Sequence, residues 1–335
     1  MKILLLGGTG AIGSHLANIL SERGDKVVVT SRSRNGIIGS TEYRQGNAKD
    51  IEFIKKILEE HWDTIVDFML YTEDEFYERV DILLNSTSKY IFISSARVYD
   101  NSNEPITEES KRLLDSCTDS DFLATNEYSL TKARQENMLI LSNKNNWVII
   151  RPYITYSEKR LQLGTLEKES WLYRALRGRT IVFSDDMMNH MTTLTYGFDV
   201  ASGIASIIHN SGSIKEIYNI TNEYPCKWSD ILNIYLNVLE KRLGYRPKVL
   251  YQNLSNFLTW NPGKYQIIYD RLFDRVFDCA KINHLINKKE FTKVQDGLQK
   301  CMNDFLDNPE FGYINWKYEA IKDRYTKEFT SLREI

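Results

Sequence analysis

The sequence is poor in cysteine, proline and histidine. Its 335 residues include four cysteines, six prolines and five histidines. The histidines form no H-x-x-x-H or H-E-x-x-H array, so we predict no metal site. The cysteines lack C-x-x-C spacing, which argues against a zinc site or a disulfide framework and favours a reduced, cytoplasmic setting.

An excess of one charge sign and long apolar runs are missing as well. The 43 basic and 45 acidic residues leave a formal net charge of −2, which gives no electrostatic reason to expect a nucleic acid or an anionic membrane as partner. The N-terminal run M-K-I-L-L-L-G-G is too short for a signal peptide or a membrane span, and we interpret it as a strand. We therefore predict neither a nucleic-acid partner nor a membrane partner.

Short apolar runs instead alternate with helical patterns through the first half of the chain. This alternation is typical of a parallel sheet with crossover helices. The predicted strands are residues 2–6, 26–30, 64–68, 90–94 and 147–151, and the helical patterns between the first four cover 11–23, 50–60 and 74–87.

The apolar pattern becomes less regular after Pro152, and a further strand is predicted at 216–220. The fold class is therefore α/β: a Rossmann-type doubly wound parallel sheet with a smaller C-terminal substrate-binding cap. The predicted division is a dinucleotide-binding domain of residues 1–155, which 191–221 rejoins, and an α/β cap of residues 156–190 and 222–335.

The motif G-G-T-G-A-I-G, residues 7–13, follows the first predicted strand and precedes a helix. Glycines there let the backbone approach a pyrophosphate, and the helix N-terminus offers it N–H groups and a positive dipole end. The alternative is a simple packing turn. The predicted cofactor contacts from this loop are Gly7, Thr9, Gly10, Ala11, Ile12 and Gly13.

The end of the second strand bears on which dinucleotide is bound. An acidic side chain there suits the ribose of NAD, whereas arginine suits the 2′-phosphate of NADP. The stretch T-S-R-S-R-N places Ser31, Arg32 and Arg34 there, with no acidic residue before Glu42. NADP(H) is therefore favoured, NAD(H) stays open, and solvated loop arginines are the alternative. The stretch G-N-A-K-D, residues 46–50, is predicted to end a further strand before the one at 64–68, and Asn47 and Ala48 are predicted to lie at an adenine edge.

Two further motifs carry candidate catalytic groups. I-S-S-A-R-V-Y, residues 93–99, ends the fourth predicted long strand, where hydroxyls face the cleft of an open sheet. N-E-Y-S-L-T-K-A-R-Q, residues 126–135, spaces Tyr128 and Lys132 so that a helix brings them to one face. The same spacing recurs at Tyr313 with Lys317 and at Tyr318 with Lys322, so spacing alone identifies no catalytic pair.

With these motifs and I-I-R-P-Y-I-T-Y, residues 149–156, in order, the chain resembles the extended short-chain dehydrogenase/reductases. Within that superfamily it is similar to the NAD(P)-dependent nucleotide-sugar epimerase/dehydratase family, over about residues 1–220. The resemblance implies that Tyr128 is the acid/base, that Lys132 lowers its pKa and holds the nicotinamide ribose, and that Ser95 orients the substrate oxygen. Electrostatics agrees, because a nearby ammonium stabilises a phenolate. The resemblance also implies a homodimer.

The substrate half departs from the family pattern. Family dehydratases carry Asp-Glu after the catalytic Ser or Thr, whereas Ala96 and Arg97 stand here, which disfavours dehydration. Ile154, Ser157 and Thr192 likewise replace residues that the family uses around its substrate. The predicted substrate contacts are Ser94, Ala96, Arg97, Tyr153 and Arg275. Candidates for a diphosphate, each equally open to being a solvated charge, are Arg151, Lys159, Arg160, Lys264, Arg271 and Arg275.

These features predict an NAD(P)-dependent epimerase-type oxidoreductase that transfers hydride at a carbon of a nucleotide sugar or another small hydroxy or keto substrate. An NADPH-dependent keto-sugar reductase is the alternative within the same family. A non-catalytic dinucleotide-binding regulator is the alternative outside enzymes, and the intact set of Ser95, Tyr128 and Lys132 weighs against it.

Overall fold

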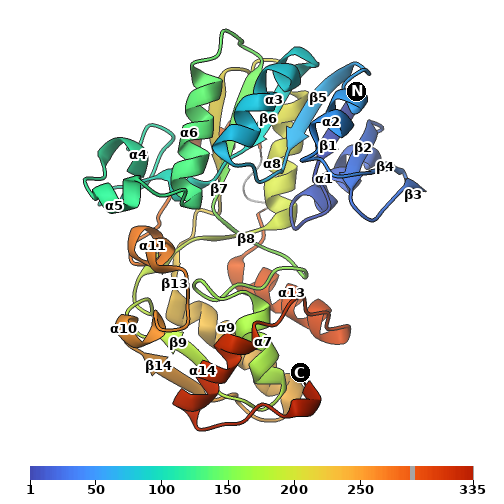
Figure 1. The fold of residues 1–335 in the computed structure, drawn as a ribbon. Coiled ribbons are helices and arrows are strands. Elements are labelled where there is room, and N and C mark those ends of the chain that lie inside the picture. The colour runs from blue at the N-terminus through green and yellow to red at the C-terminus, as the bar shows by residue number, and fades with distance from the viewer. Residues whose placement is uncertain (287–290, 335) are drawn as a thin grey trace.

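The computed structural model describes residues 1–286 and 291–334. The chain forms two lobes that lie one above the other in Figure 1. The N-terminal lobe contains the large sheet, and the second lobe, with the C-terminus at its far end, contains helices and short two-stranded sheets. The predicted cap segment 222–335 includes positions 287–290 and 335, which lie outside the described residues.

The central sheet has eight strands in the order β12-β7-β6-β5-β1-β2-β4-β3. All neighbours pair in parallel except β3, which runs antiparallel to β4 at the edge. The bounds are β1 Lys2–Leu6, β2 Lys26–Ser31, β3 Gly36–Ile38, β4 Thr41–Gln45, β5 Trp62–Asp67, β6 Thr87–Ile93, β7 Trp147–Pro152 and β12 Glu216–Ile220. The predicted α/β fold with a doubly wound sheet is confirmed.

Strand order reverses at β1, which has β2 on one side and β5 on the other. Ligands of open α/β sheets bind outside the carboxyl ends of the strands at such a switch point. Both faces of β1 are buried: Ile3 and Leu5 join one apolar cluster, whereas Leu4 and Leu6 join the other. A continuous apolar run is therefore what a strand at this position requires.

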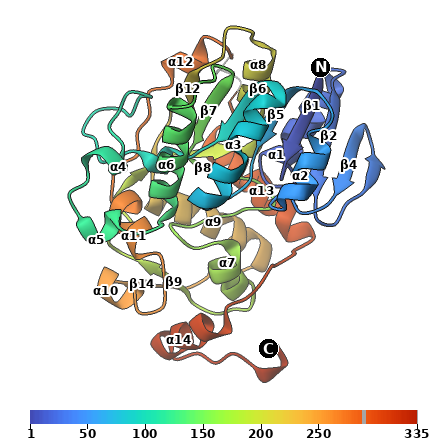
Figure 2. The ribbon, with the colours of Figure 1, turned by 45° about the horizontal axis from the view of Figure 1, so that its top comes forward.

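Helices cover both faces of the sheet (Figure 2). Helices α1 and α8 share one apolar cluster, and α2, α3 and α6 share the cluster on the opposite face. Their bounds are α1 Gly13–Glu22, α2 Ile51–Ile57, α3 Glu73–Asn85, α6 Tyr128–Ile140 and α8 Gly197–His209. Shorter helical segments beside this lobe are η1 Ala96–Val98, α4 Leu113–Ser116, α5 Ser120–Leu123 and α12 Ala280–Asn283.

The start of α6 is fixed by its own sequence. Glu127 precedes the helix in an extended conformation, and its carboxylate accepts a hydrogen bond from the Ser129 backbone N–H at 2.6 Å. An acidic cap satisfies a free helix N–H and complements the positive end of the helix dipole. Tyr128 is therefore the first helical residue, at the end of α6 that faces the second lobe.

The second lobe follows β7, and the chain returns to the first lobe through α8 and β12. Outside the central sheet, the strands pair as β8 with β11, β9 with β14 and β10 with β13. Their bounds are β8 Ile154–Tyr156, β9 Ile181–Ser184, β10 Met191–Thr192, β11 Leu194–Tyr196, β13 Cys226–Lys227 and β14 Val249–Gln252. The helical segments are α7 Lys168–Leu176, α9 Trp228–Leu243, α10 Leu254–Phe257, α11 Lys264–Gln266, the π-helix η2 Ile267–Arg271, α13 Val294–Asp307, α14 Trp316–Thr326 and η4 Leu332–Glu334.

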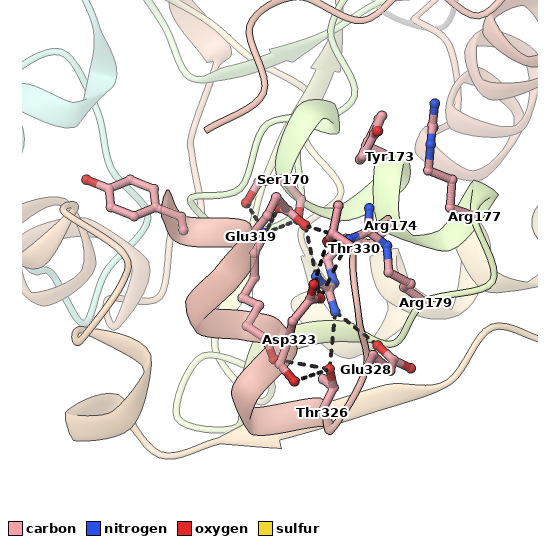
Figure 3. A network of polar contacts seen from close by, with 12 residues as sticks. Ser170, Tyr173, Arg174, Arg177, Arg179, Glu319, Asp323, Thr326, Glu328 and Thr330 are labelled. Atoms are coloured by element: carbon pink, nitrogen blue, oxygen red, sulfur yellow. Dashed lines mark hydrogen bonds and ion pairs between the residues drawn. The ribbon is translucent and has the colours of Figure 1, made fainter. Parts of the chain in front are cut away.

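A buried ionic network attaches the C-terminal segment to the second lobe (Figure 3). Arg174 of α7 is fully buried and donates to Glu319 at 2.8 Å and to Asp323 at 2.7 Å, both on α14, and to Glu328 at 3.0 Å. Lys322, one of the lysines at Y-x-x-x-K spacing, donates to the Ser170 carbonyl at 2.7 Å. The network therefore holds α14 against α7.

The surroundings of the other Y-x-x-x-K pairs differ from those of Tyr128. Tyr313 precedes α14 and is 82% exposed. Tyr318 and Lys322 belong to α14, where Lys322 takes part in the network of Figure 3. Within the part of the chain that the structure describes, no helix is long and apolar enough to cross a membrane, and no group of His, Cys, Asp and Glu side chains is arranged to hold a metal ion.

Candidate functional site

A cavity of about 760 Å³ lies at the carboxyl edge of the central sheet and extends to the second lobe. Its lining combines the loop after β1, the segments that follow β5 and β6, the start of α6 and the segment around β8 with residues of the second lobe. The lining residues are Gly7, Gly10, Ala11, Ile12, Gly13, Phe68, Leu70, Ile93, Ser94, Ser95, Arg97, Tyr128, Pro152, Tyr153, Ile154, Thr155, Arg160, Gln162, Thr165, Glu167, Gln266 and Arg271.

The glycine loop forms one wall of this cavity. Gly7 has a φ of +70°, a left-handed conformation that a residue with a side chain rarely adopts. A Cβ on Gly13 would lie 2.6 Å from the Gly8 Cα, so only glycine permits this close approach of α1 to the loop. Thr9 is the one predicted loop residue that does not line the cavity.

Tyr128 and Ser95 line the cavity together. The Arg97 guanidinium carbon lies 5.1 Å from the centre of the Tyr128 ring. Burial raises the pKa of the Tyr128 phenol above its usual value, while the positive charge of Arg97 and a hydrogen bond with Ser95 act in the opposite direction. Both opposing groups therefore stabilise the phenolate.

Lys132 lies one helical turn from Tyr128 but behind the cavity wall. It is 2% exposed, and its Nζ donates to the Ile93 carbonyl at 2.9 Å and lies 4.3 Å from the centre of the Phe92 ring. Burial lowers the pKa of Lys132 to about 8, and the charges of Asp67 and Glu136 oppose this shift. The ammonium is thus held at the end of β6.

Ser94, predicted as a substrate contact, is held in a buried polar network. Its hydroxyl donates to Glu136 at 2.5 Å, and Glu136 also accepts from Arg151 at 2.9 and 2.7 Å. Arg151, one of the diphosphate candidates, is 2% exposed and does not line the cavity. Glu136 was missed, although its position four residues after Lys132 on one helix face was a usable signal.

Arg275, predicted as a substrate contact, does not line the cavity. It is completely buried, and its guanidinium donates to the carbonyls of Tyr99 and Asp100 and to Asp270. These bonds join the segment that follows η2 to the segment after β6. Tyr153 does line the cavity, and its hydroxyl lies 3.1 Å from Asp270 Oδ1.

Three arginines line the cavity: Arg97, Arg160 and Arg271. Arg271 ends the π-helix and donates to the Gly164 carbonyl at 3.0 Å. Burial, together with the positive charges of Arg97 and Arg160, lowers the pKa of Arg271 to about 10. Glu167, which pairs with Arg160 at 3.0 Å, is the one acidic side chain among the described lining residues.

The residues predicted for the adenosine half lie outside the lining of this cavity. The Ser31 hydroxyl accepts hydrogen bonds from the backbone N–H groups of Ser33 and Arg34. Arg34 also lies against Tyr43, with its guanidinium carbon 5.3 Å from the ring centre, whereas Arg32 is exposed. Asn47 caps its own turn by accepting from the Lys49 N–H at 3.1 Å, and Ala48 is buried.

The sequence was compared with protein-family models, and the model described as the NAD dependent epimerase/dehydratase family matches residues 3–221. The chain belongs to this family. The prediction of an enzyme of the extended short-chain dehydrogenase/reductase type is thereby confirmed. By the description of the family, a nicotinamide dinucleotide is its cofactor.

Relatives of this family member have names that refer to different functions. The chain is 28% identical over 338 residues to a chloroplast stem-loop binding protein of 41 kDa from Arabidopsis thaliana, and the match covers 95% of this chain and 82% of that protein. It is 25% identical to a dTDP-D-glucose 4,6-dehydratase from Dictyostelium discoideum, over 71% of this chain and 62% of that protein.

Solved structures of epimerases share the fold of this family member. An epimerase from Methanothermobacter thermautotrophicus matches with a TM-score of 0.71 and 16% identity, over 96% of this chain and 94% of that one. A UDP-glucuronic acid 4-epimerase from Bacillus cereus, solved with UDP-glucuronic acid and NAD, matches with a TM-score of 0.68 and 17% identity, over 92% and 99%.

Proposed function

We propose that the chain is an NAD(P)-dependent nucleotide-sugar epimerase in which Tyr128 is the acid/base. One observation carries this proposal: the glycine loop, Ser95 and Tyr128 line a single cavity of about 760 Å³ at the switch point of the sheet. A dinucleotide and a sugar must meet at the phenol for this chemistry, and only a shared cavity permits it.

In this proposal each group at the reacting carbon has a separate task. The Ser95 hydroxyl holds the sugar oxygen, and Tyr128 Oη accepts the proton of that hydroxyl group and later returns it. Burial raises the pKa of Tyr128, and the charge of Arg97 and the hydrogen bond with Ser95 offset this by stabilising the phenolate. In the family, the lysine at the position of Lys132 holds the nicotinamide ribose, and we assign Lys132 that task. The bound dinucleotide supplies the hydride acceptor and donor.

The residues present fit a dinucleotide at the glycine loop. Gly10 lines the cavity, and a Cβ there would meet no atom within 4 Å, which leaves the loop open toward a ligand. The N-terminus of α1 begins at Gly13 and provides free N–H groups for a pyrophosphate. The exposed Arg32 after β2 supports NADP(H) over NAD(H), because its guanidinium is available to a 2′-phosphate.

We further propose that Arg160 and Arg271 contact the diphosphate of the substrate. Both line the cavity from the side of the second lobe, and guanidinium groups suit phosphate oxygens. Residues 1–155 with 191–221 then act as the dinucleotide-binding domain, and 156–190 with 222–335 act as the substrate cap. A homodimer, as the family implies, completes the proposal.

Two other functions are alternatives to the epimerase. The proposed preference for NADP(H) favours a reductase, because reduction consumes the reduced cofactor whereas epimerisation leaves it unchanged. The name of the Arabidopsis relative suggests binding of an RNA or DNA stem-loop as another function. The net charge of −2 gives this function no electrostatic support.

A screen of UDP-, GDP- and dTDP-sugars tests the proposal when the product sugar and the nicotinamide absorbance are followed together. An epimerase yields a product sugar without net change of the cofactor, and a reductase consumes NADPH in proportion to product. Turnover of none of these sugars, or a failure of both NADPH and NADH to bind, would show that the proposed function is wrong.

A further inference from the structure

Glu127, the residue directly before Tyr128, uses its two carboxylate oxygens for two different contacts. Its Oε2 accepts hydrogen bonds from the backbone N–H of Ser129 at 2.6 Å and from the Ser129 hydroxyl at 2.5 Å, and the first of these caps α6. Its Oε1 accepts a hydrogen bond from Nη2 of Arg97, which lies in the turn η1. The carboxylate thus connects the start of the helix that carries Tyr128 with the turn that follows Ser95.

The guanidinium of Arg97 lies against the Tyr128 ring, with its carbon 5.1 Å from the ring centre and within the range of a cation–π interaction. The bond to Glu127 is the one hydrogen bond from this guanidinium that the described residues accept. Asp270, the other carboxylate beside Arg97, lies 3.8 Å from Nε, beyond hydrogen-bond distance, and also pairs with two other arginines. Glu127 is therefore the contact that holds Arg97 at the ring.

The ion pair of Glu127 and Arg97 is largely shielded from water, because 14% of each side chain is exposed. Charges that are partly removed from water interact more strongly than charges at the surface. A long arginine side chain otherwise samples many rotamers, so an anchor at its tip determines where its charge lies. At Tyr128 that position matters, because the charge of Arg97 favours the phenolate whereas burial disfavours it.

We propose that Glu127 is a positioning residue for the acid/base: it holds the Arg97 guanidinium against the Tyr128 ring, where this cation stabilises the phenolate. The inference rests on the proposed function, in which Tyr128 accepts and returns the proton. Glu127 is not among the residues that line the cavity, so it acts through Arg97 rather than on the substrate.

Other polar and charged groups also lie near the phenol or on the elements beside it. They are Ser95 after β6, Lys132 on α6, Arg160 and Glu167 between β8 and α7, and Asp270 and Arg271 of η2. In the part of the chain that the structure describes, none of them shares a hydrogen bond or an ion pair with Glu127. A change at Glu127 therefore reaches the phenol through Arg97 or through the charge of Glu127 itself.

The variant Glu127→Asp separates these two routes. Aspartate keeps the negative charge and is a good N-cap, but its side chain is one methylene too short to hold Arg97 as well. The titration of the Tyr128 phenol then reports the position of Arg97 without any substrate. The full-length protein is labelled with fluorotyrosine, because fluorine makes the phenol more acidic and provides an NMR signal. The resonance that is lost in Tyr128→Phe identifies Tyr128.

Arg97→Met should raise the pKa of Tyr128 by about one pH unit, because a cation close to the phenolate is lost. Glu127→Asp should raise this pKa by a similar amount, and the combined variant should exceed Arg97→Met by little. Fixed charges shift a pKa additively, so effects of the two changes that simply add would overturn the inference. An unchanged pKa in Glu127→Asp or in Arg97→Met would overturn it as well.

Glu73→Asp is the matched control, because it shortens another carboxylate that pairs with an arginine of α6, Arg134, at 2.7 Å and outside the cavity. It should leave the titration of Tyr128 unchanged, and a shift equal to that of Glu127→Asp would overturn the inference. The titration is independent of the sugar screen. Turnover of no nucleotide sugar would reject the proposed function even where the phenol titrates as expected.

Discussion

One helical turn separates Tyr128 from Lys132, yet the two side chains have different surroundings. Tyr128 faces the cavity, whereas Lys132 is buried between α6 and β6, with its Nζ on the Ile93 carbonyl. Burial of a charged amine costs free energy, and for this reason the pKa of Lys132 is lowered to about 8. An apolar residue at this position would avoid that cost, so Lys132 lowers the stability of the fold.

Replacing Lys132 by methionine should therefore stabilise the fold while it impairs turnover. A pKa that falls from 10.5 to about 8 corresponds to a penalty on the order of 3 kcal/mol at pH 7. The Ile93 carbonyl loses its donor at about 1 kcal/mol, which leaves a net gain of about 2 kcal/mol. Urea unfolding of both proteins measures this difference in the free energy of unfolding.

The pH dependence of that difference has a defined sign. Between pH 8 and 10.5 the unfolded chain binds more protons at Lys132 than the folded one, so the stability of the wild-type protein rises with pH relative to Lys132→Met. The gain from the substitution should shrink from pH 7 to pH 10. A wild-type protein that is already as stable as the variant at pH 7 would contradict this account of Lys132.

The proposed preference for NADP(H) rests on Arg32. It is exposed after β2, whereas Arg34 lies against Tyr43. Arg32→Gln should weaken NADPH binding by about ten-fold, because a hydrogen bond between two charged groups is lost, and leave NADH binding unchanged. Fluorescence titration with both cofactors measures this, and Arg23→Gln, an exposed arginine at the end of α1, is the control. Equal loss for both cofactors would exclude a 2′-phosphate contact.

Among the secondary-structure elements, those with a strong local signal were predicted from the sequence. The strands at 2–6, 26–30 and 216–220 were predicted to within one residue because their apolar runs are bounded by loops. The strand β3, Gly36–Ile38, was not, since all its residues are exposed and no apolar pattern marks it. The carboxyl ends of β1 and β6 bring the glycine loop and Ser95 together, so both were predictable from strand ends alone.

The cap contribution to the site could not be predicted in the same way. Arg271 reaches the cavity because η2 lies against the segment around Gly164, whose carbonyl accepts a hydrogen bond from Arg271 over a separation of 107 residues. Arg271 and Arg275 each follow an aspartate in the sequence, so the local sequence does not distinguish them. The tertiary fold places Arg271 in the cavity lining and buries Arg275 against the Tyr99 carbonyl. Local periodicity carries no information on that choice.

The ionic network that attaches α14 to α7 should contribute to the free energy of unfolding. Arg174→Met leaves Glu319, Asp323 and Glu328 without their shared cation in a largely buried network (Figure 3). Removing one partner of a buried ionic network costs about 3–5 kcal/mol. Urea unfolding should show this loss, whereas Arg324→Met, an exposed change on the same helix, should change the free energy of unfolding by less than about 0.5 kcal/mol. Equal effects of both changes would contradict the assigned role of the network.

In the whole molecule, the cavity depends on both lobes. The first lobe supplies the glycine loop, Ser95 and Tyr128, and the second lobe supplies Arg160 and Arg271. The family model matches residues 3–221, which include the first set and Arg160, whereas Arg271 lies outside the match.

The most direct test of the central claim is the turnover of the Tyr128→Phe variant on whichever nucleotide sugar the wild-type protein accepts. The substitution removes the hydroxyl that transfers the proton and keeps the ring, so turnover should fall by about 10²–10⁴-fold, with cofactor and sugar binding retained. Tyr313→Phe, at an exposed tyrosine outside the cavity, is the matched control and should keep full activity. If Tyr128→Phe keeps turnover within about three-fold of the wild-type rate, Tyr128 is not the acid/base and the account is contradicted.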